Sequence, residues 1–121
     1  MEGDAEPRVG ADAEGKERVP ANESRARWYR MSGTIGGAPA AIVSFGHPDN
    51  FRAPQPIRVN PDDPMVCWAP SQLGEWEIEP GKPYVARYRF AVWDEAPAVE
   101  EIERLWGDYA EPVRASLKAR P

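Results

Sequence analysis

Side chains able to do chemistry gather within residues 44–56 of the 121-residue chain, in the run SFGHPDNFRAPQP. His47, the only histidine, and Asp49 are candidate catalytic residues, because an imidazole and a carboxylate can move protons near neutral pH. Asn50 and Arg52 are candidate ligand-binding residues, since an amide and a guanidinium fork can hold hydroxyl or carboxylate groups. These residue types predict acid–base chemistry on a polar ligand, or binding of one.

Three prolines stiffen this stretch. Pro48, Pro54 and Pro56 each hold φ at about −65° and lack a backbone N–H, so the sequence predicts a loop rather than a helix or a central strand. A stiff polar loop carried by strands is a common place for function in a β protein. The alternative is a proline-rich connector whose polar side chains only face water, and the residues alone leave both open.

A hairpin is expected to deliver the chain into this loop. Residues 27–35 alternate with the period of a strand, residues 38–45 are largely apolar, and Gly36 and Gly37 lie between them. A type I′ turn needs positive φ at both central residues, which glycine adopts readily. Shorter strands are expected at residues 57–59, 65–68 and 74–78.

The most regular strand pattern covers residues 83–93. Arg87 and Arg89 share one of its faces, and they are further candidate ligand-binding residues if that face borders a cleft. The alternative is a solvent-facing position in which the arginine stems lie over apolar neighbours. The two faces would consist of Tyr84, Ala86, Tyr88, Phe90 and Val92, and of Val85, Arg87, Arg89, Ala91 and Trp93.

An amphipathic helix is expected to follow this strand. Asp94 or Glu95 suits the positive end of the helix dipole, and Pro97 suits the first turn. Pro112 must end or kink the helix near residues 109–110, because proline lacks the backbone donor. The apolar stripe of this helix would consist of Val99, Ile102, Trp106, Tyr109, Val113 and Leu117.

Composition favours one small domain built of short strands and turns. Hydrophobic residues make up 41% of the chain, and 14 prolines and 10 glycines are many for this length. Residues 1–24 hold few large apolar side chains and are expected to form a disordered or loosely packed polar leader. Residues 25–121 are then the domain. The net charge of −5 lies mostly in the leader, so a nucleic-acid partner is not expected.

Other classes are disfavoured by single residues and short runs. Cys67 and His47 are the only cysteine and histidine, so neither a metal site nor a cofactor is expected. No apolar run reaches the roughly 18 residues of a membrane-spanning helix. The acidic start does not look like a signal peptide, so a soluble protein is expected, with the cytoplasm as the default compartment.

Several short motifs follow one another between residues 25 and 110. The central one is HPDNFRAP, in which His47, Asn50 and Arg52 stand at fixed spacing. The others are RW, SGTIGG, a later glycine, RYRF and LWGDYA, at residues 27–28, 32–37, 81, 87–90 and 105–110. In this order they resemble the PmoA-like family, a bacterial family of unknown function labelled "methane oxygenase PmoA".

This resemblance implies an antiparallel β-sandwich with a C-terminal helix, similar to the galactose-mutarotase-like supersandwich folds. The chain would be the C-terminal part of a larger family domain, and His47, Asn50 and Arg52 would be its polar signature. The function it implies is a carbohydrate-related binding or catalytic domain with a polar loop at residues 46–58. Whether such a domain is an enzyme is left open.

The alternative function is a non-catalytic structural or interaction β-domain in which the same loop only braces the fold. The placement of His47 distinguishes the two, because a cleft shared with Asp49, Arg52 and the strand arginines favours a ligand site. An imidazole bonded to backbone favours bracing. The helix can cover only part of one sheet face, leaving apolar residues such as Val85 and Trp93 exposed. Self-association or a missing N-terminal half is therefore expected.

Overall fold

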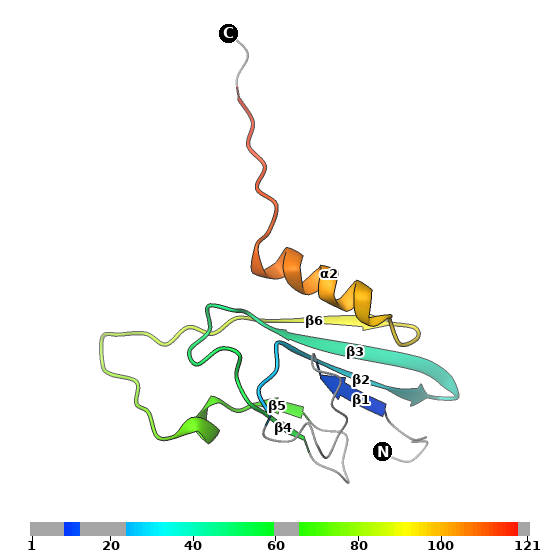
Figure 1. Cartoon of the computed structure of the whole chain (residues 1–121), viewed down its shortest axis with the longest axis horizontal. Coiled ribbons are helices and arrows are strands. Elements are labelled where there is room, and N and C mark those ends of the chain that lie inside the picture. The colour runs from blue at the N-terminus through cyan, green and yellow to red at the C-terminus, as the bar shows by residue number, and fades with distance from the viewer. Residues whose placement is uncertain (1–8, 13–23, 60–65, 119–121) are drawn as a thin grey trace.

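The computed structural model describes residues 9–12, 24–59 and 66–118 (Figure 1). They form antiparallel sheets with one α-helix after the last strand, so the mainly β prediction is confirmed at this level. No helix in the described ranges has the length and apolar character needed to cross a membrane. The elements are β1 (Val9–Asp12), β2 (Trp28–Ile35), β3 (Ala38–Gly46), β4 (Ile57–Val59), β5 (Val66–Trp68), the 3-10 helix η1 (Pro70–Leu73), β6 (Tyr88–Trp93) and α2 (Val99–Ala110).

The predicted hairpin is confirmed and forms the centre of the sheet. β2 and β3 pair antiparallel from Trp28 opposite Phe45 to Ile35 opposite Ala38. The turn between them has positive φ at both glycines, 60° at Gly36 and 84° at Gly37. The sheet order is β1-β2-β3-β6, so β3 is an inner strand whose end leads into the polar loop.

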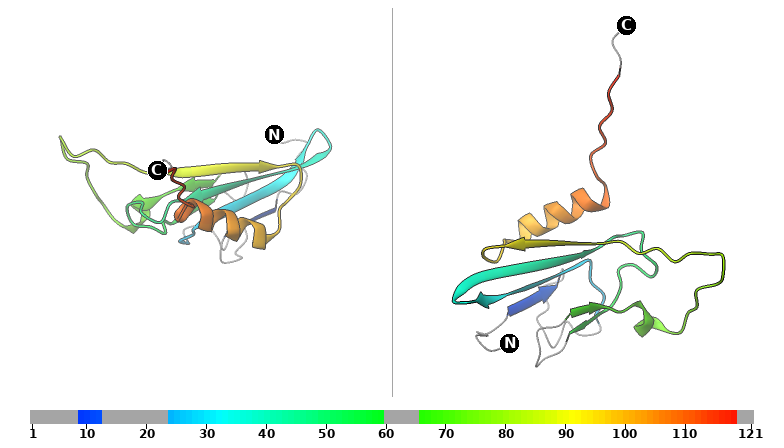
Figure 2. Two further views of the ribbon diagram at one scale, coloured as in Figure 1. Left: turned by 90° about the horizontal axis from the view of Figure 1, so that it is seen from above. Right: turned by 180° about the vertical axis from the view of Figure 1, so that it is seen from behind.

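Helix α2 covers one face of this sheet (Figure 2). Its central residue Ile102 is fully buried against Trp28, Val43 and Phe45. Ala91 and Trp93 of β6 pack around the same cluster, so the helix covers the face on which Trp93 was expected to stay exposed. The connection between β6 and α2, residues 94–98, determines which face of the sheet the helix covers. The helix residues Leu105, Trp106 and Tyr109 complete the contact.

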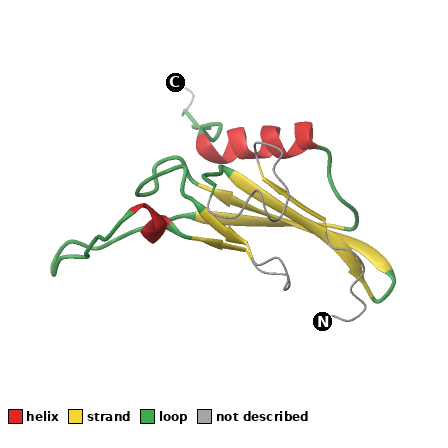
Figure 3. Ribbon diagram, turned by 60° about the horizontal axis from the view of Figure 1, so that its bottom comes forward, coloured by secondary structure: helices red, strands yellow, loops and turns green. Residues whose placement is uncertain are grey.

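Among the described residues, the opposite face is covered only at one end, by the two-stranded ribbon of β4 and β5 (Figure 3). There Tyr29 packs with Ile57 and Val59 in a second apolar cluster. Farther along this face Phe90 and Val92 are 63% and 73% exposed. The expected bare apolar face therefore exists, although it is the face opposite the predicted one.

Two element boundaries differ from the sequence pattern. Residues 74–78 were expected as a strand, and residues 83–87 as the start of another, but both are irregular. Alternation of side chains predicts a strand only where a neighbouring backbone can pair with it, and neither segment has such a neighbour in the described sheets. The long excursion from η1 to β6 therefore extends from the body as an irregular loop (Figure 1).

The helix begins later than predicted and ends where predicted. Its N-cap is Ala98, because residues 94–98 are used to turn the chain from β6 onto the sheet face. The last helical residue is Ala110, as the position of Pro112 required. Val113 and Leu117, assigned to the apolar stripe from their spacing, lie beyond the helix and are exposed.

The predicted leader contains a strand at Val9–Asp12. This strand, β1, pairs antiparallel with β2, from Val9 opposite Ser32 to Asp12 opposite Tyr29. Low hydrophobicity indicated disorder here, but an edge strand can be held by backbone hydrogen bonds alone. Residues 1–8 and 13–23 of the leader lie outside the described residues.

A partly buried ion pair between Arg27 and Glu103 connects α2 to the residue before β2. The Arg27 guanidinium donates to both oxygens of Glu103, at 2.7 and 2.8 Å, and the Trp28 indole N–H donates to the second oxygen at 3.1 Å. The Arg27 guanidinium also lies 5.0 Å from the Trp106 ring centre. The hydrogen bonds from Arg27 hold the pKa of the Glu103 carboxyl below its usual value, against a smaller opposing effect of burial.

We expect Gly36→Val with Gly37→Val to lower the free energy of unfolding by about 1–2 kcal/mol per site, because a β-branched residue is strained at positive φ. A Cβ at either site meets nothing within 4 Å, so the backbone conformation is the only cause. Denaturant unfolding measures the loss. Gly107→Ala in α2 is the control and should stabilise the chain slightly. A double valine variant as stable as the parent would contradict the turn.

We expect Glu103→Gln to reduce stability at neutral pH by about 1 kcal/mol, a value lowered by the partial solvent exposure of the pair. Because the pKa of Glu103 is lower in the folded chain, its contribution is present above the ordinary glutamate pKa of about 4.3. It is lost as the pH falls toward the folded value.

Melting temperatures measured from pH 7 down to pH 3 should therefore converge for parent and Glu103→Gln in acid. Glu100→Gln, an exposed position on the same helix, is the matched control. Curves that stay parallel through the acid range would show that the pair does not titrate as described.

Candidate functional site

The side chain of Asn50 ties the polar loop to the chain entering β6. Its Oδ1 accepts from the Arg87 backbone N–H at 2.8 Å, and its Nδ2 donates to the Arg87 carbonyl at 2.8 Å. The side chain of Asn50 is buried, and both its polar atoms are used. The amide thus gives Arg87 the donor and acceptor that a neighbouring strand would supply.

His47 is fixed by backbone and by an aromatic neighbour. The Asp49 backbone N–H donates to Nδ1 of His47 at 3.1 Å, so Nδ1 is an acceptor and the proton of the neutral ring lies on Nε2. The His47 side chain is 10% exposed, and its ring meets Tyr109 edge-to-face with the ring centres 5.1 Å apart. The Asp49 carboxylate is 3.9 Å from Nδ1 and 84% exposed, too far for a hydrogen bond. The expected acid–base couple is therefore not assembled.

Arg52 points its guanidinium at the excursion that follows η1. Its N–H groups donate to the carbonyls of Pro70, Gly74 and Glu75 at 3.0, 2.8 and 3.1 Å. The guanidinium also lies 4.7 Å from the ring centre of Phe51. Arg52 itself has φ of 61°, a left-handed conformation that costs a non-glycine residue energy. Its three hydrogen bonds hold it there.

The two strand arginines do not join the loop residues in one cleft. Arg87 contributes its backbone to Asn50, and its carbonyl also accepts from the His47 N–H at 3.3 Å, while its side chain is exposed. The Arg89 guanidinium lies 4.6 Å from the ring centre of Tyr109. Both side chains therefore match the solvent-facing alternative.

Residues outside the predicted set complete the bracing. Gln55 is buried, its Nε2 donates to the Phe51 carbonyl at 2.7 Å, and its Oε1 accepts from the Tyr88 hydroxyl at 2.5 Å. Burial is the main cause that raises the pKa of Tyr88, so its hydroxyl stays a donor. The Trp106 indole N–H donates to the Gly46 carbonyl at 3.0 Å. The only sequence signal for these residues was the position of Gln55 between Pro54 and Pro56 in the polar loop.

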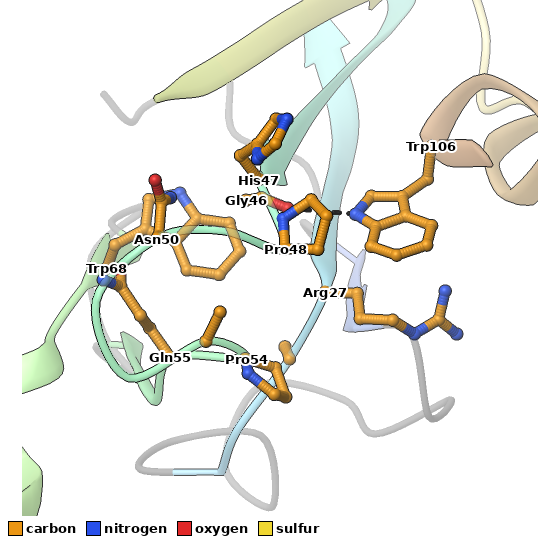
Figure 4. A pocket seen from close by; sticks show the side chains of 11 residues that line it. Arg27, Gly46, His47, Pro48, Asn50, Pro54, Gln55, Trp68 and Trp106 are labelled. Carbon is orange, nitrogen blue, oxygen red and sulfur yellow. Dashed lines mark hydrogen bonds between the residues drawn. The ribbon is translucent and has the colours of Figure 1, made fainter. Parts of the chain in front are cut away.

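A small cavity lies between the loop and α2 (Figure 4). Its volume is about 140 Å³, below the roughly 300 Å³ at which ligand pockets begin. His47 and Asn50 border it, and both polar atoms of Asn50 and the Nδ1 of His47 are used as described above. Trp68 closes one side so tightly that a Cβ on Gly46 would lie 3.3 Å from its ring. The other lining residues include Ala26, Arg27, Pro48, Ala53, Pro54, Gln55 and Trp106.

A second hollow, of about 170 Å³, lies on the excursion between η1 and β6. Trp76 packs against Phe51 and Tyr84, with ring centres 4.9 and 4.8 Å apart. Glu77 and Glu79 border the same hollow, so aromatic faces and carboxylates meet there. The sequence predicted a strand at residues 74–78 and did not bring these three rings together.

Metal ligands do not cluster in the described part of the chain. No group of three His, Cys, Asp or Glu side chains with metal-binding spacing occurs within residues 9–12, 24–59 and 66–118. Cys67 is exposed and not in a disulfide.

Comparison with protein families shows which family the chain matches. A model described as a family of unknown function, DUF6807, matches residues 4–107. The resemblance to the PmoA-like family is thereby corrected, since the family found for this span is DUF6807. Searches of curated proteins and of solved structures give no match.

We expect Asn50→Asp to lower the free energy of unfolding by about 2–3 kcal/mol. The variant keeps the acceptor for the Arg87 N–H but turns a carboxylate oxygen toward the Arg87 carbonyl. That carbonyl then loses its 2.8 Å donor, keeps only the longer bond from the His47 N–H, and faces a repelling oxygen. Urea unfolding measures the change. The adjacent Asp49→Asn is the matched control and should alter stability by less than about 0.5 kcal/mol. Equal stability of the two variants would show that the paired hydrogen bonds are not needed.

Proposed function

The chain belongs to DUF6807, a family of unknown function, and we propose that it is a non-catalytic domain whose loop at residues 46–58 braces the fold. One observation carries this proposal: both polar atoms of Asn50, the two terminal guanidinium nitrogens of Arg52 and the Nδ1 of His47 are bonded to the chain's own backbone. The residues that suggested a reaction therefore hold loops together.

A catalytic role has less support. General acid–base catalysis needs a group whose proton-accepting atom can reach the substrate. In His47 the Nδ1 lone pair is already used by the Asp49 N–H, and Asp49 points into water. The adjoining cavity is small and most of its lining is apolar, with the guanidinium of Arg27 engaged by Glu103. This arrangement suits packing better than turnover.

A second candidate function is binding of a carbohydrate at the outer aromatic cluster of Phe51, Trp76 and Tyr84. Binding sites are lined by aromatic faces with a few polar groups, and sugar rings have apolar faces that can stack on such rings. The hollow beside Trp76 is also smaller than a usual ligand pocket, but its aromatic rings, with the carboxylates of Glu77 and Glu79 at the border, favour this site over the loop itself. The brace does not use Trp76 or Tyr84, whereas the third ring, Phe51, is also covered by the Arg52 guanidinium.

The β-sandwich expected from the sequence remains a proposal in a reduced form. What supports it is the packing of the β4–β5 ribbon against the main sheet through Tyr29, Ile57 and Val59. We propose a partial sandwich at this end of the sheet. The galactose-mutarotase-like form rested on the corrected resemblance and is not proposed.

A pooled glycan-binding and glycoside-turnover screen tests both functions on the parent, His47→Gln, Asp49→Asn and Trp76→Ala. We expect no turnover that depends on His47 or Asp49, a lower melting temperature for His47→Gln, and at least about tenfold weaker glycan binding for Trp76→Ala. Turnover in the parent that is abolished in Asp49→Asn at an unchanged melting temperature would contradict the proposal that the loop only braces the fold. Binding that Trp76→Ala leaves intact would overturn the aromatic site.

A further inference from the structure

Residues 111–118, called the arm from here on, leave the end of α2 and extend away from the rest of the chain (Figures 1 and 2). The arm contains no helix or strand, and all of its residues are exposed. Val113 and Leu117 are 89% and 102% exposed. The arm therefore carries large apolar side chains that its own chain leaves in water.

The arm nevertheless has the pattern of a half-buried strand. Val113, Ala115 and Leu117 alternate with Arg114, Ser116 and Lys118. In extended backbone this alternation places the apolar side chains on one face and both basic ones on the other. A single strand gains nothing from such a pattern until it joins a sheet. The arm is in this sense a strand without a neighbour.

Strand β6 offers the edge that such a strand needs. It pairs with β3 on one side, and no described strand lies on its other side. Natural edge strands are usually protected by charge, proline or a covering element. β6 contains no proline or lysine, and its one charged side chain, Arg89, lies over the Tyr109 ring. On the face opposite α2, its exposed Phe90 and Val92 continue toward Ile42 of β3.

We propose that the arm of one copy of this chain adds to β6 of a second copy as an antiparallel strand. The exchange is reciprocal, which gives a two-fold dimer joined by two added strands. Val113, Ala115 and Leu117 then lie beside Phe90 and Val92 and extend the apolar row across the joined sheet.

The direction of pairing determines which charged side chains the arm meets. An antiparallel arm begins beside the end of β6, where Asp94 and Glu95 follow directly. Glu100 and Glu101 lie in the first turn of α2, above that same end. Arg114 on the opposite face of the arm therefore meets acidic side chains, whereas Lys118 at the other end lies near Arg87 and Arg89. These two effects oppose each other, so the antiparallel direction rests on the greater stability of antiparallel pairing and on the course of the chain described next.

The fold of one chain explains why the partner is a second copy. Tyr109 near the end of α2 contacts Arg89 and His47, so the arm starts beside the beginning of β6. From there the arm could run along its own β6 only in the parallel direction. Antiparallel pairing requires it to arrive at the far end of β6, as an arm from another molecule can. This inference does not depend on the role of the polar loop.

Light scattering over a concentration series tests the exchange on the full chain. We expect the parent to be dimeric and Leu117→Asp to dissociate with a dissociation constant at least about tenfold higher. Ser116→Asp, one residue away on the other face of the arm, is the matched control and should stay dimeric. Val92→Lys, on the receiving edge, should dissociate like Leu117→Asp. All three sites are exposed, so each variant should keep the parent's melting curve at high dilution.

Hydrogen exchange then locates the contact. The backbone amides of residues 88–93 that face away from β3 should exchange slowly in the parent and quickly in Leu117→Asp. A monomeric parent, or a dimer unaffected by both Leu117→Asp and Val92→Lys, would overturn the proposal. Slow exchange in a monomer would show that the arm pairs with its own β6, and would overturn it equally.

Discussion

The paired hydrogen bonds between the Asn50 amide and the Arg87 backbone are the constraint on which the arrangement of the loop depends. Residues 69–87 form a long excursion without a strand partner in the described sheets, so the backbone groups of Arg87 need a donor and an acceptor from elsewhere. Asn50 supplies both to Arg87 at the point where β6 begins. The amide therefore fixes where the excursion rejoins the sheet and, with it, where Phe90 and Trp93 lie on β6.

The other loop contacts act on the same principle. Arg52 and Arg25 donate to backbone carbonyls of η1, of the excursion and of the loop itself, and the Trp106 indole donates to Gly46. In each case a long side chain satisfies a backbone group that secondary structure leaves over. Histidine, asparagine and arginine are residues of active sites and of such braces alike. What separates the two uses is whether their polar atoms face a ligand or the chain.

Local rules predicted those parts of the structure that local forces decide. The hairpin followed from alternation and from Gly36 and Gly37, and the end of α2 followed from Pro112. The irregular residues 83–87 did not follow, because a strand-like pattern does not reveal whether a partner is within reach. The candidate loop was located correctly, yet its role depended on a contact between Asn50 and Arg87. Those residues are 37 positions apart, and no spacing rule connects them.

The contact of Arg27 and Trp28 with Glu103 of α2 has a consequence for the order in which the chain folds. Arg27 and Trp28 meet Glu103 across 76 and 75 positions of sequence, whereas the β2–β3 hairpin closes through two glycines. Contacts of large sequence separation form late and slow the folding of a domain. During synthesis the hairpin can form while α2 is still unmade, with Trp28 and Phe45 facing water. On the ribosome, the apolar surface of Trp28 and Phe45 would stay exposed until Ile102 has been synthesised. At that stage a chaperone could bind this surface.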